Sequence, residues 1–212
     1  MIDTKQKIMD TAVRVFAAQG YGGTSLRHII AEAQVNLAAI HYHFGSKEEL
    51  LDAVIGEKVR PVNEQRLELL ARVEARAPGQ PGAIEEILEA FLAPAILMVS
   101  QNGEFPRMMG RLIGEGLMPE VARRHFAEVG RRFFGLLRRE LPGLSESEIS
   151  WRIQITIGAM AHCLCRGPED WHGQGQRTLD SEEMVKELVT FLAAGFRAPS
   201  GRERQGVASG EK

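Results

Sequence analysis

Hydrophobic residues recur at steps of three and four along most of this chain, which is the spacing that buries one side of an α-helix. In the first such stretch, Ile8, Ala12 and Phe16 share one side. Asp3 stands where a helix cap is expected, and Gly20 follows the last turn. The pattern predicts a helix over residues 4–18. Because no segment shows the alternation typical of a strand, we predict an all-α fold.

A second and a third helix are expected within the next thirty residues. Leu26, Ile29 and Ala33 share one side of the second helix, for which Thr24 is the expected cap. The third helix, over residues 37–43, follows after only a few residues. Two short helices joined by a tight connection form a helix-turn-helix, a geometry that places its second helix in a groove of DNA.

The third helix has two unlike sides. With 100° per residue, Ile40 and Phe44 point one way, while Ala38 and Tyr42 point the other. The apolar pair is expected to face the core of the protein. The opposite side is then small, polar and aromatic, which suits methyl contacts with thymine and hydrogen bonds to bases or phosphates.

The remaining sequence predicts a helical body. Ser46 and Glu49 form a capping box that starts a long helix, which is expected to bend or break at Pro61 and to resume before Ala77. Five more helices are expected over residues 84–98 with a kink at Pro94, 105–113, 119–141, 145–166 and 180–196. The prediction is nine helices, three in a head and six in a body. The domains are a helix-turn-helix DNA-binding domain at residues 1–50, a ligand-binding and dimerisation domain at residues 51–197, and a disordered tail at residues 198–212.

Composition and charge limit the possible functions. The chain has 212 residues, of which 44% are hydrophobic, so it can bury a substantial core. Its formal net charge is −2, whereas residues 1–47 carry five basic side chains against three acidic ones. This weak local excess predicts few phosphate contacts and a moderate dependence of DNA binding on salt. No apolar run reaches the length of a membrane span, and the first residues lack the apolar core of a signal peptide, so we expect a cytoplasmic protein.

Two sequence strings carry a resemblance to a known family. After the first amphipathic helix comes Gly20-Tyr-Gly-Gly-Thr-Ser, and later Ile40-His-Tyr-His-Phe-Gly-Ser-Lys-Glu-Glu-Leu. Together they resemble the N-terminal domain of the tetracycline-repressor (TetR/AcrR) family of bacterial transcription regulators, over about the first quarter of the chain. From this resemblance and the exposed side of the third helix, we expect DNA contacts from Ser25, Arg27, Asn36, Leu37, Ala38, Ala39, His41, Tyr42, His43 and Lys47.

Methionine and phenylalanine side chains gather in the predicted body, where they can line an adaptable apolar pocket or serve as ordinary core. The candidates for a ligand cavity are Phe91, Met98, Phe105, Met108, Met109, Leu112, Phe133 and Met160. Segments around residues 105–115, 141–153 and 158–162 resemble, more loosely, regulators that sense fatty acids or acyl thioesters. Within them, Arg111 is expected to pair with Glu115 four residues later, although it could also meet an anionic ligand.

The family resemblance implies a homodimer in which the last two helices of each subunit form a four-helix bundle. The residues expected at this interface are Ile149, Ile153, Ile157, Met184, Leu188 and Phe191. The function expected is a ligand-responsive repressor that binds a palindromic operator and is released by a small apolar or amphiphilic effector, possible examples being a fatty acid or acyl-CoA. An activator or a ligand-independent DNA-binding protein of the same fold is the alternative.

Enzymatic and metal-dependent functions find little support in the sequence. The motifs HExxH, GxxxxGK and GxSxG are missing, so neither an enzyme nor a cofactor is predicted. His41 and His43 lack an evident third metal ligand. Cys163 and Cys165 point about 200° apart on one helix, which disfavours a disulfide or chelation by the pair and favours ordinary burial. A purely protein-binding helical module remains as a rival, but it leaves the Tyr42 side of the third helix unexplained.

Overall fold

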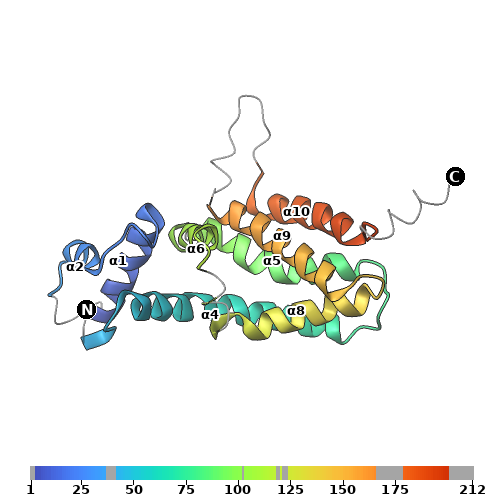
Figure 1. Ribbon diagram of the computed structural model, residues 1–212, viewed down its shortest axis with the longest axis horizontal. Helices are drawn as coiled ribbons and strands as arrows, with labels where there is room; N and C mark the ends of the chain where they lie inside the picture. Colours follow the sequence, from blue (N-terminus) through green and yellow to red (C-terminus); the bar gives the residue numbers. More distant parts are fainter. Residues whose placement is uncertain are drawn as a thin grey trace, which may run out of the picture.

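A helical head and a helical body are joined by one long helix in the computed structural model of the chain (Figure 1). The structure describes residues 3–36, 42–101, 103–117, 120, 124–165 and 179–200. In Figure 1 the long helix α4 (Lys47–Glu74) runs along one side of the body and α10 (Ser181–Arg197) along the opposite side, with α5 (Ala83–Gln101) between them. The described residues contain eight helices and no strand, which confirms the predicted all-α fold.

The head is built on α1 (Thr4–Gln19) and α2 (Leu26–Ala33). Asp3 caps α1 as predicted, through a hydrogen bond from the Lys5 amide. The predicted cap of α2 was wrong by one residue, because Ser25 and not Thr24 accepts the hydrogen bond from the His28 amide. Thr24 is buried instead, and its hydroxyl donates to the Gly20 carbonyl at 2.8 Å. The threonine thereby closes the turn between the two helices.

Helix α4 continues through Pro61, so the predicted bend or break did not separate two helices. It begins with the expected capping box, in which Ser46 and Glu49 satisfy each other's backbone amides. Proline removes the hydrogen bond to the carbonyl four residues earlier. Pro61 and Glu57 are both exposed, so water can bind that carbonyl, and the buried face of α4 holds the helix against the body. α5 likewise contains Pro94 within one helix.

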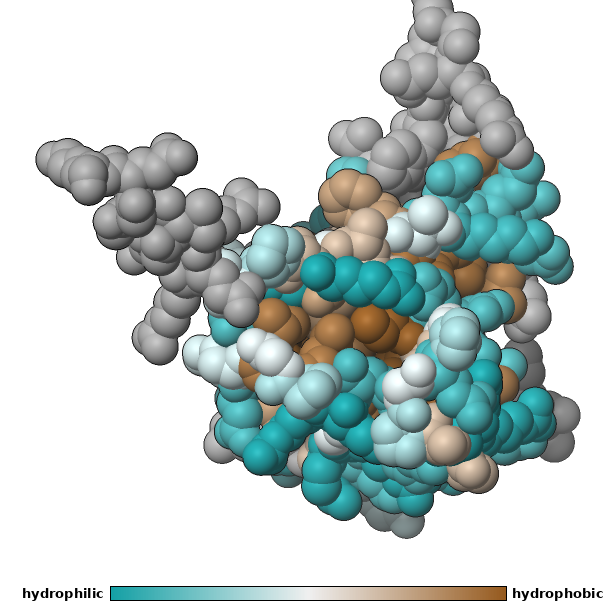
Figure 2. All heavy atoms as spheres, turned by 90° about the vertical axis from the view of Figure 1, so that its right-hand side faces the viewer, coloured by the Kyte–Doolittle hydropathy of each residue, from teal (hydrophilic) through white to brown (hydrophobic). Residues whose placement is uncertain are grey.

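The body is completed by α6 (Glu104–Gly114), α8 (Ala127–Glu140) and α9 (Glu146–Cys165). The single helix predicted over residues 119–141 was wrong, because Phe126 interrupts it and α8 starts after that residue. α6 packs against both α1 and α9, and α5 packs against α10. Figure 2 looks at the end of the body away from the head and shows apolar side chains in a hollow framed by hydrophilic ones.

The C-terminal end of α10 is fixed by a side chain from α9. The Arg152 guanidinium donates to the carbonyls of Gly195, Phe196 and Ala198 at 2.6 to 3.0 Å, which satisfies acceptors that a helix end leaves open. Ser200 is buried as well. Packed structure therefore extends to Ser200, beyond the expected start of the tail at Ala198, and residues 201–212 lie outside the described residues. No helix in the described part of the chain is long and apolar enough to cross a membrane.

Candidate DNA-binding face and effector cavity

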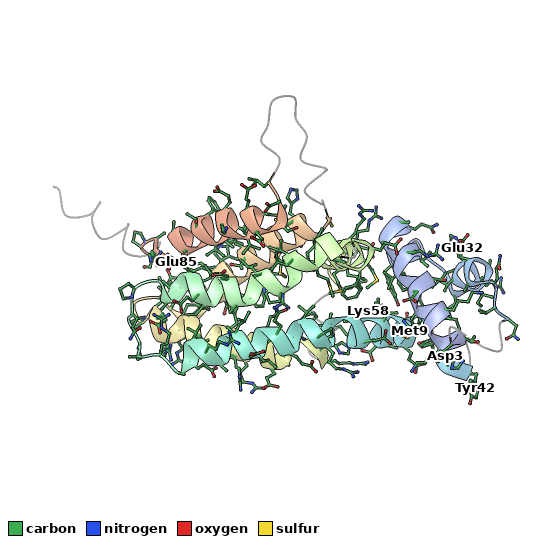
Figure 3. The ribbon with its side chains drawn as sticks, turned by 180° about the vertical axis from the view of Figure 1, so that it is seen from behind. Asp3, Met9, Glu32, Tyr42, Lys58 and Glu85 are labelled. Atoms are coloured by element: carbon green, nitrogen blue, oxygen red, sulfur yellow. The ribbon has the colours of Figure 1, made fainter. Side chains whose placement is uncertain are left out.

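Tyr42 is the most prominent side chain of the candidate DNA-binding face. It lies in a helical turn, is 86% exposed, and projects away from the helices at the end of the head (Figure 3). Phe44, two residues later, is buried in the core, and the His43 ring meets Tyr42 edge-on at 5.0 Å between ring centres. The outward tyrosine and inward phenylalanine agree with the predicted orientation. The expected contacts Leu37, Ala38, Ala39 and His41, with Ile40, lie outside the described residues.

Three other expected DNA contacts are on the surface of the head. Ser25, Arg27 and Asn36 are exposed, and Ser25 also caps α2. A helix start offers backbone amides to an anion, so this arrangement suits a phosphate contact near Ser25 and Arg27.

Lys47 has a structural role that the sequence pattern did not indicate. Its ammonium group donates to the carbonyls of Tyr21 at 3.0 Å and Thr24 at 2.9 Å, and it lies 4.0 Å from the centre of the Tyr21 ring. The Tyr21 hydroxyl donates to Glu48 at 2.8 Å. Burial and the neighbouring Glu48 carboxylate raise the pKa of Tyr21, and the same hydrogen bond lowers the pKa of Glu48. These contacts fasten the turn after α1 to the first turn of α4.

The head is also held by the end of α6. Glu115 accepts hydrogen bonds from the backbone amides of Tyr21 at 3.2 Å and Gly22 at 3.3 Å. The sequence had suggested Arg111 as its partner. Gly20 adopts φ +75°, and a side chain there would collide with the Glu115 carboxylate, so this close approach requires glycine. The body therefore meets the head through both α4 and α6.

A cavity of about 640 Å³ lies in the body among α4, α5, α6, α8 and α9. Its volume is typical of a small-molecule site, and its wall is mostly apolar. Six of the predicted ligand-binding residues line it: Phe91, Met98, Phe105, Met109, Phe133 and Met160. The other two, Met108 and Leu112, are buried in the core outside the cavity wall. Both lie on the flank of α6 next to the stripe that carries Phe105, Met109 and Ile113.

Arg66 is a candidate functional residue that was not among the predicted ligand-binding residues. Its side chain lines the cavity and is only 2% exposed. Its Nε donates to the Phe91 carbonyl at 2.8 Å, and its terminal nitrogens donate to Asn63 Oδ1 at 3.4 Å and Met160 Sδ at 3.5 Å. The guanidinium carbon lies 4.6 Å from the centre of the Phe91 ring, which stacks on Phe133.

Burial lowers the pKa of Arg66 to about 10, so the side chain remains a cation at neutral pH. Its position could have been found in the sequence. Val59, Val62, Leu70 and Val73 form the buried stripe of α4, and Arg66 occupies the step between Val62 and Leu70. A charged residue within an inward-facing apolar stripe signals a buried polar site.

The predicted interface residues on α9 and α10 are mostly turned inward. Ile149 is fully buried, Met184 is buried, and Ile153 and Ile157 line the cavity, so these four pack within the subunit. Leu188 is half-buried.

Phe191, in contrast, is 74% exposed. On the side of α9 opposite to Ile153, Trp151 is 67% exposed and Ile155 is also exposed. Both sides of α9 carry apolar residues, which is why spacing alone did not separate the core side from the outer side. Trp151 and Ile155 were not among the predicted interface residues.

The cysteines fit ordinary packing. Cys163 is buried and Cys165 half-buried, and burial raises the pKa of both thiols. Within the described ranges, no group of three histidine, cysteine or carboxylate side chains is arranged to hold a metal ion. The second histidine of the His41-x-His43 pair is described and the first is not.

A head with an outward tyrosine on a predicted helix-turn-helix, joined to a body that contains a largely apolar cavity, is typical of a DNA-binding regulator. Comparison with known proteins agrees. The family model described as "Bacterial regulatory proteins, tetR family" matches residues 8–54, and "Tetracyclin repressor-like, C-terminal domain" matches residues 89–195. The chain belongs to the TetR family of transcriptional regulators, and it is not an enzyme.

Two relatives of known name are similar to part of the chain. The regulator AcrR of Shigella flexneri is 36% identical over 87 residues, which are 41% of this chain and 39% of AcrR. The nicotine-responsive repressor HdnoR of Paenarthrobacter nicotinovorans is 41% identical over 56 residues, or 26% of this chain and 29% of HdnoR. The chain thus matches less than half of the length of either relative.

Solved structures resemble the chain over most of its length. The fatty acid degradation regulator FadR from Bacillus halodurans superimposes with a TM-score of 0.59 at 18% identity, covering 93% of this chain and 98% of FadR. A TetR-like regulator from Rhodococcus sp. RHA1 gives a TM-score of 0.59 at 19% identity, covering 97% and 96%. At these identities the likeness shows the shared fold.

Proposed function

We propose that this regulator is a homodimeric repressor that binds a near-palindromic operator and is released when a small apolar or amphiphilic effector enters the cavity of the body. One observation carries the proposal. The cavity is lined by α4 and α6, and these two helices also hold the head, through Lys47 and Glu115 respectively. A molecule that fills the cavity acts on both connections at once.

The proposed route from cavity to DNA follows these helices. On α4 the residues that line the cavity are Val59, Val62 and Arg66, and the first turn of the same helix is bound to the head. On α6 the cavity contacts Met109 and Ile113, and this helix is followed by the carboxylate that binds the head. An effector that favours a different spacing of α4 and α6 then changes the position of the head. Release requires that the effector bind the DNA-incompetent arrangement more tightly than the competent one.

In the proposed DNA contact, the third helix enters the major groove while Arg27, Tyr42 and the start of α2 meet the backbone. Asn36, Leu37, Ala38, Ala39, His41 and His43 are proposed to contribute around it. Ser25 is exposed at the helix start, which supports a backbone contact. For Lys47, two of its three N–H groups are already used within the head, so the lysine is proposed to present the remaining one to a phosphate.

The proposed dimer uses the outer side of α9 and α10. Trp151, Ile155 and Phe191 are large apolar side chains exposed on these helices. Large exposed apolar groups of this kind mark interaction surfaces. A two-fold contact between such surfaces fixes the separation of the two heads, which lets both recognition helices reach successive major grooves, about 34 Å apart. Dimerisation is thus part of the proposed DNA recognition.

The effector class is proposed from the apolar wall of the cavity. The name of the structurally similar FadR, a fatty acid degradation regulator, supports an amphiphilic molecule, whereas the name of HdnoR shows that a relative responds to nicotine.

The test of the whole proposal uses the purified full chain. Genomic fragments that the protein retains are selected, and the binding of the best fragment is then measured in a gel-shift titration with and without amphiphiles. Binding as a dimer, with loss of affinity when an amphiphile is added, is the expected result. Retention of no fragment would refute DNA binding. Retention unaffected by all amphiphiles would support the ligand-independent alternative.

A further inference from the structure

Arg66 is a buried cation whose described neighbours include no carboxylate. Its three hydrogen bonds go to a backbone carbonyl, an amide oxygen and a thioether sulfur, all of which are neutral. Two exposed arginines of the body behave differently, since Arg138 pairs with Glu146 and Arg197 with Glu85. The one arginine that has lost almost all contact with water is thus without a charged partner among the described residues.

A buried guanidinium of this kind is unfavourable unless a group of opposite charge pairs with it. A charge removed from water loses hydration energy, which only a paired charge with good hydrogen bonds restores. A guanidinium has five N–H donors, and the three bonds described use three of them. The bond to Asn63 is long at 3.4 Å, and the thioether sulfur of Met160, at 3.5 Å, is a weak acceptor. Arg66 retains both charge and donor capacity for a further partner.

The cavity is where that partner can lie. No acidic side chain is among the described residues of its wall, and the polar members are Arg66, Arg131 and Gln154. Arg131 is exposed, whereas Arg66 is buried. The cavity therefore combines a long apolar surface with one buried positive charge. Its complement is a molecule with a hydrocarbon portion and a single, compact negative group.

We infer that the effector is an amphiphile ending in a free carboxylate, which binds the Arg66 guanidinium while its hydrocarbon chain packs against Met98, Phe105 and Met109. This inference rests on the proposed function, because it specifies the occupant of the proposed effector cavity. Carboxylate oxygens match the planar guanidinium fork and can accept two hydrogen bonds from it. An alcohol or ester of the same chain length fills the same apolar space but leaves the cation unpaired.

The same reasoning selects the free acid over its coenzyme A thioester. The acyl end of a thioester carries no charge, and its nucleotide phosphates require water, which does not reach Arg66. A single compact carboxylate gives up less hydration on entering beside this side chain than a nucleotide with several phosphates does. In the inferred site the protein responds to the charge of the effector as well as to its volume. Arg66 donates to the Phe91 carbonyl of α5 and to Met160 of α9, so it links α4 to both helices. A carboxylate that competes for the guanidinium changes the contacts of α4 with both helices.

The test compares matched ligands on the full-length protein by isothermal titration calorimetry, below their micelle concentrations. The probes are straight-chain acids from octanoate to hexadecanoate, the alcohols and methyl esters of the same lengths, and dodecanoyl coenzyme A. The proteins are the wild type, Arg66→Met, Arg66→Lys and, as the control, Arg138→Met, which removes a surface arginine that is not part of the cavity wall. Circular dichroism and operator binding without ligand monitor the fold of each variant.

For the wild type, the best acid is expected to bind at least ten-fold more tightly than its alcohol or ester. Arg66→Met should weaken binding of the acid by at least ten-fold and leave binding of the alcohol equal or tighter, since the buried charge is gone. The affinity of Arg66→Lys for the acid should lie between those of the wild type and Arg66→Met, because lysine keeps the charge but loses the planar guanidinium that can donate two hydrogen bonds. Arg138→Met should behave as the wild type.

Equal binding of acid and alcohol by the wild type overturns the inference, and so does a preference for the thioester; either result leaves the proposed ligand-responsive function standing. An acid preference that survives in Arg66→Met also overturns it. If no probe binds a protein that still binds its operator, the inference fails together with the amphiphilic effector of the proposed function. Should Arg66→Met not fold, the comparison of acid with alcohol in the wild type and in Arg66→Lys decides.

Discussion

The carboxylate of Glu115, at the end of α6, accepts a hydrogen bond from the backbone amide of Tyr21 in the turn between α1 and α2. The two residues are 94 positions apart in the sequence, and their contact joins the body to the head. A second bond, from the Gly22 amide to the same carboxylate, restricts the turn further.

Replacing Glu115 is expected to uncouple the head from the cavity. In Glu115→Ala the two amides lose their acceptor and bind water, so operator affinity without effector should change by less than about three-fold. The effector concentration needed for release should rise roughly ten-fold, corresponding to about 1.4 kcal/mol of coupling. A gel-shift titration with increasing amphiphile measures both quantities. Glu104→Ala, at the other end of α6, is the matched control, and equal release curves for all three proteins would contradict the coupling role.

Tyr42→Ala is expected to weaken binding to all DNA sequences by about the same factor. A lost hydrogen bond to the backbone corresponds to about 1 kcal/mol, or roughly five-fold for each subunit. Fluorescence anisotropy with the operator and with an unrelated duplex gives the ratio of variant to wild-type affinity for each DNA. Tyr42→Phe separates the hydroxyl from the ring. A selective loss on the operator alone would mean that Tyr42 reads bases.

Trp151→Glu is expected to convert the dimer to a monomer, because it places a charge in the proposed apolar interface. Molar mass from light scattering after gel filtration should halve at micromolar concentration, and operator affinity should fall at least ten-fold. Ser150→Glu introduces the same charge at the preceding, exposed position and should leave the dimer intact. A wild-type protein that elutes as a monomer and still binds its operator tightly would contradict the proposed assembly.

The pair of Glu85 with Arg197 predicts a dependence of stability on acid. Both terminal guanidinium nitrogens of Arg197 donate to Glu85 at 2.6 Å, joining the start of α5 to the end of α10, and this pairing lowers the pKa of Glu85. A carboxyl group whose pKa is lowered by folding stabilises the fold above its ordinary pKa, and this contribution is lost as the pH falls through the lowered value. Both side chains are more than one third exposed, so the effect is small.

Glu85→Gln is therefore expected to lower Tm by roughly 1–3 °C at pH 7, with a difference that shrinks towards pH 3. Thermal unfolding followed by circular dichroism across this range provides the comparison. Glu68→Gln, which removes a carboxylate from an exposed pair within α4, serves as the control. A difference between Glu85→Gln and the wild type that grows as the pH falls would show that the sign is wrong.

The spacing of apolar residues predicted the helices well wherever one side of a helix is buried. It failed at Pro61, because proline's local preference is outweighed by the buried stripe of α4 on both sides of it. On α9 the spacing predicted the helix but did not identify its outward side, because both sides are apolar. One side closes the core and the cavity, and the other carries Trp151, and only the packing of the whole body distinguishes them.

The residues of the candidate sites also differ in whether local sequence or the packing of the whole body determines their role. Tyr42 could be identified from residue type and spacing, and so could the cavity methionines Met98, Met109 and Met160. The same reasoning also selected Met108, which packs in the core instead. Arg66 could not be interpreted so directly, because its meaning depends on Phe91, Asn63 and Met160 coming together around it. Glu115 is a similar case, as its true partners are backbone amides that no residue pattern identifies.

The continuity of α4 through Pro61 gives the protein a lever. From Arg66 to Lys47 the helix rises by 19 residue steps, or roughly 29 Å at about 1.5 Å per step. A tilt of about 5° at the cavity then displaces the first turn by roughly 2.5 Å, which is comparable to a hydrogen-bond length and enough to misalign a helix in a groove. Had the proline divided this rod into two hinged pieces, the joint would have absorbed the same tilt before it reached the DNA.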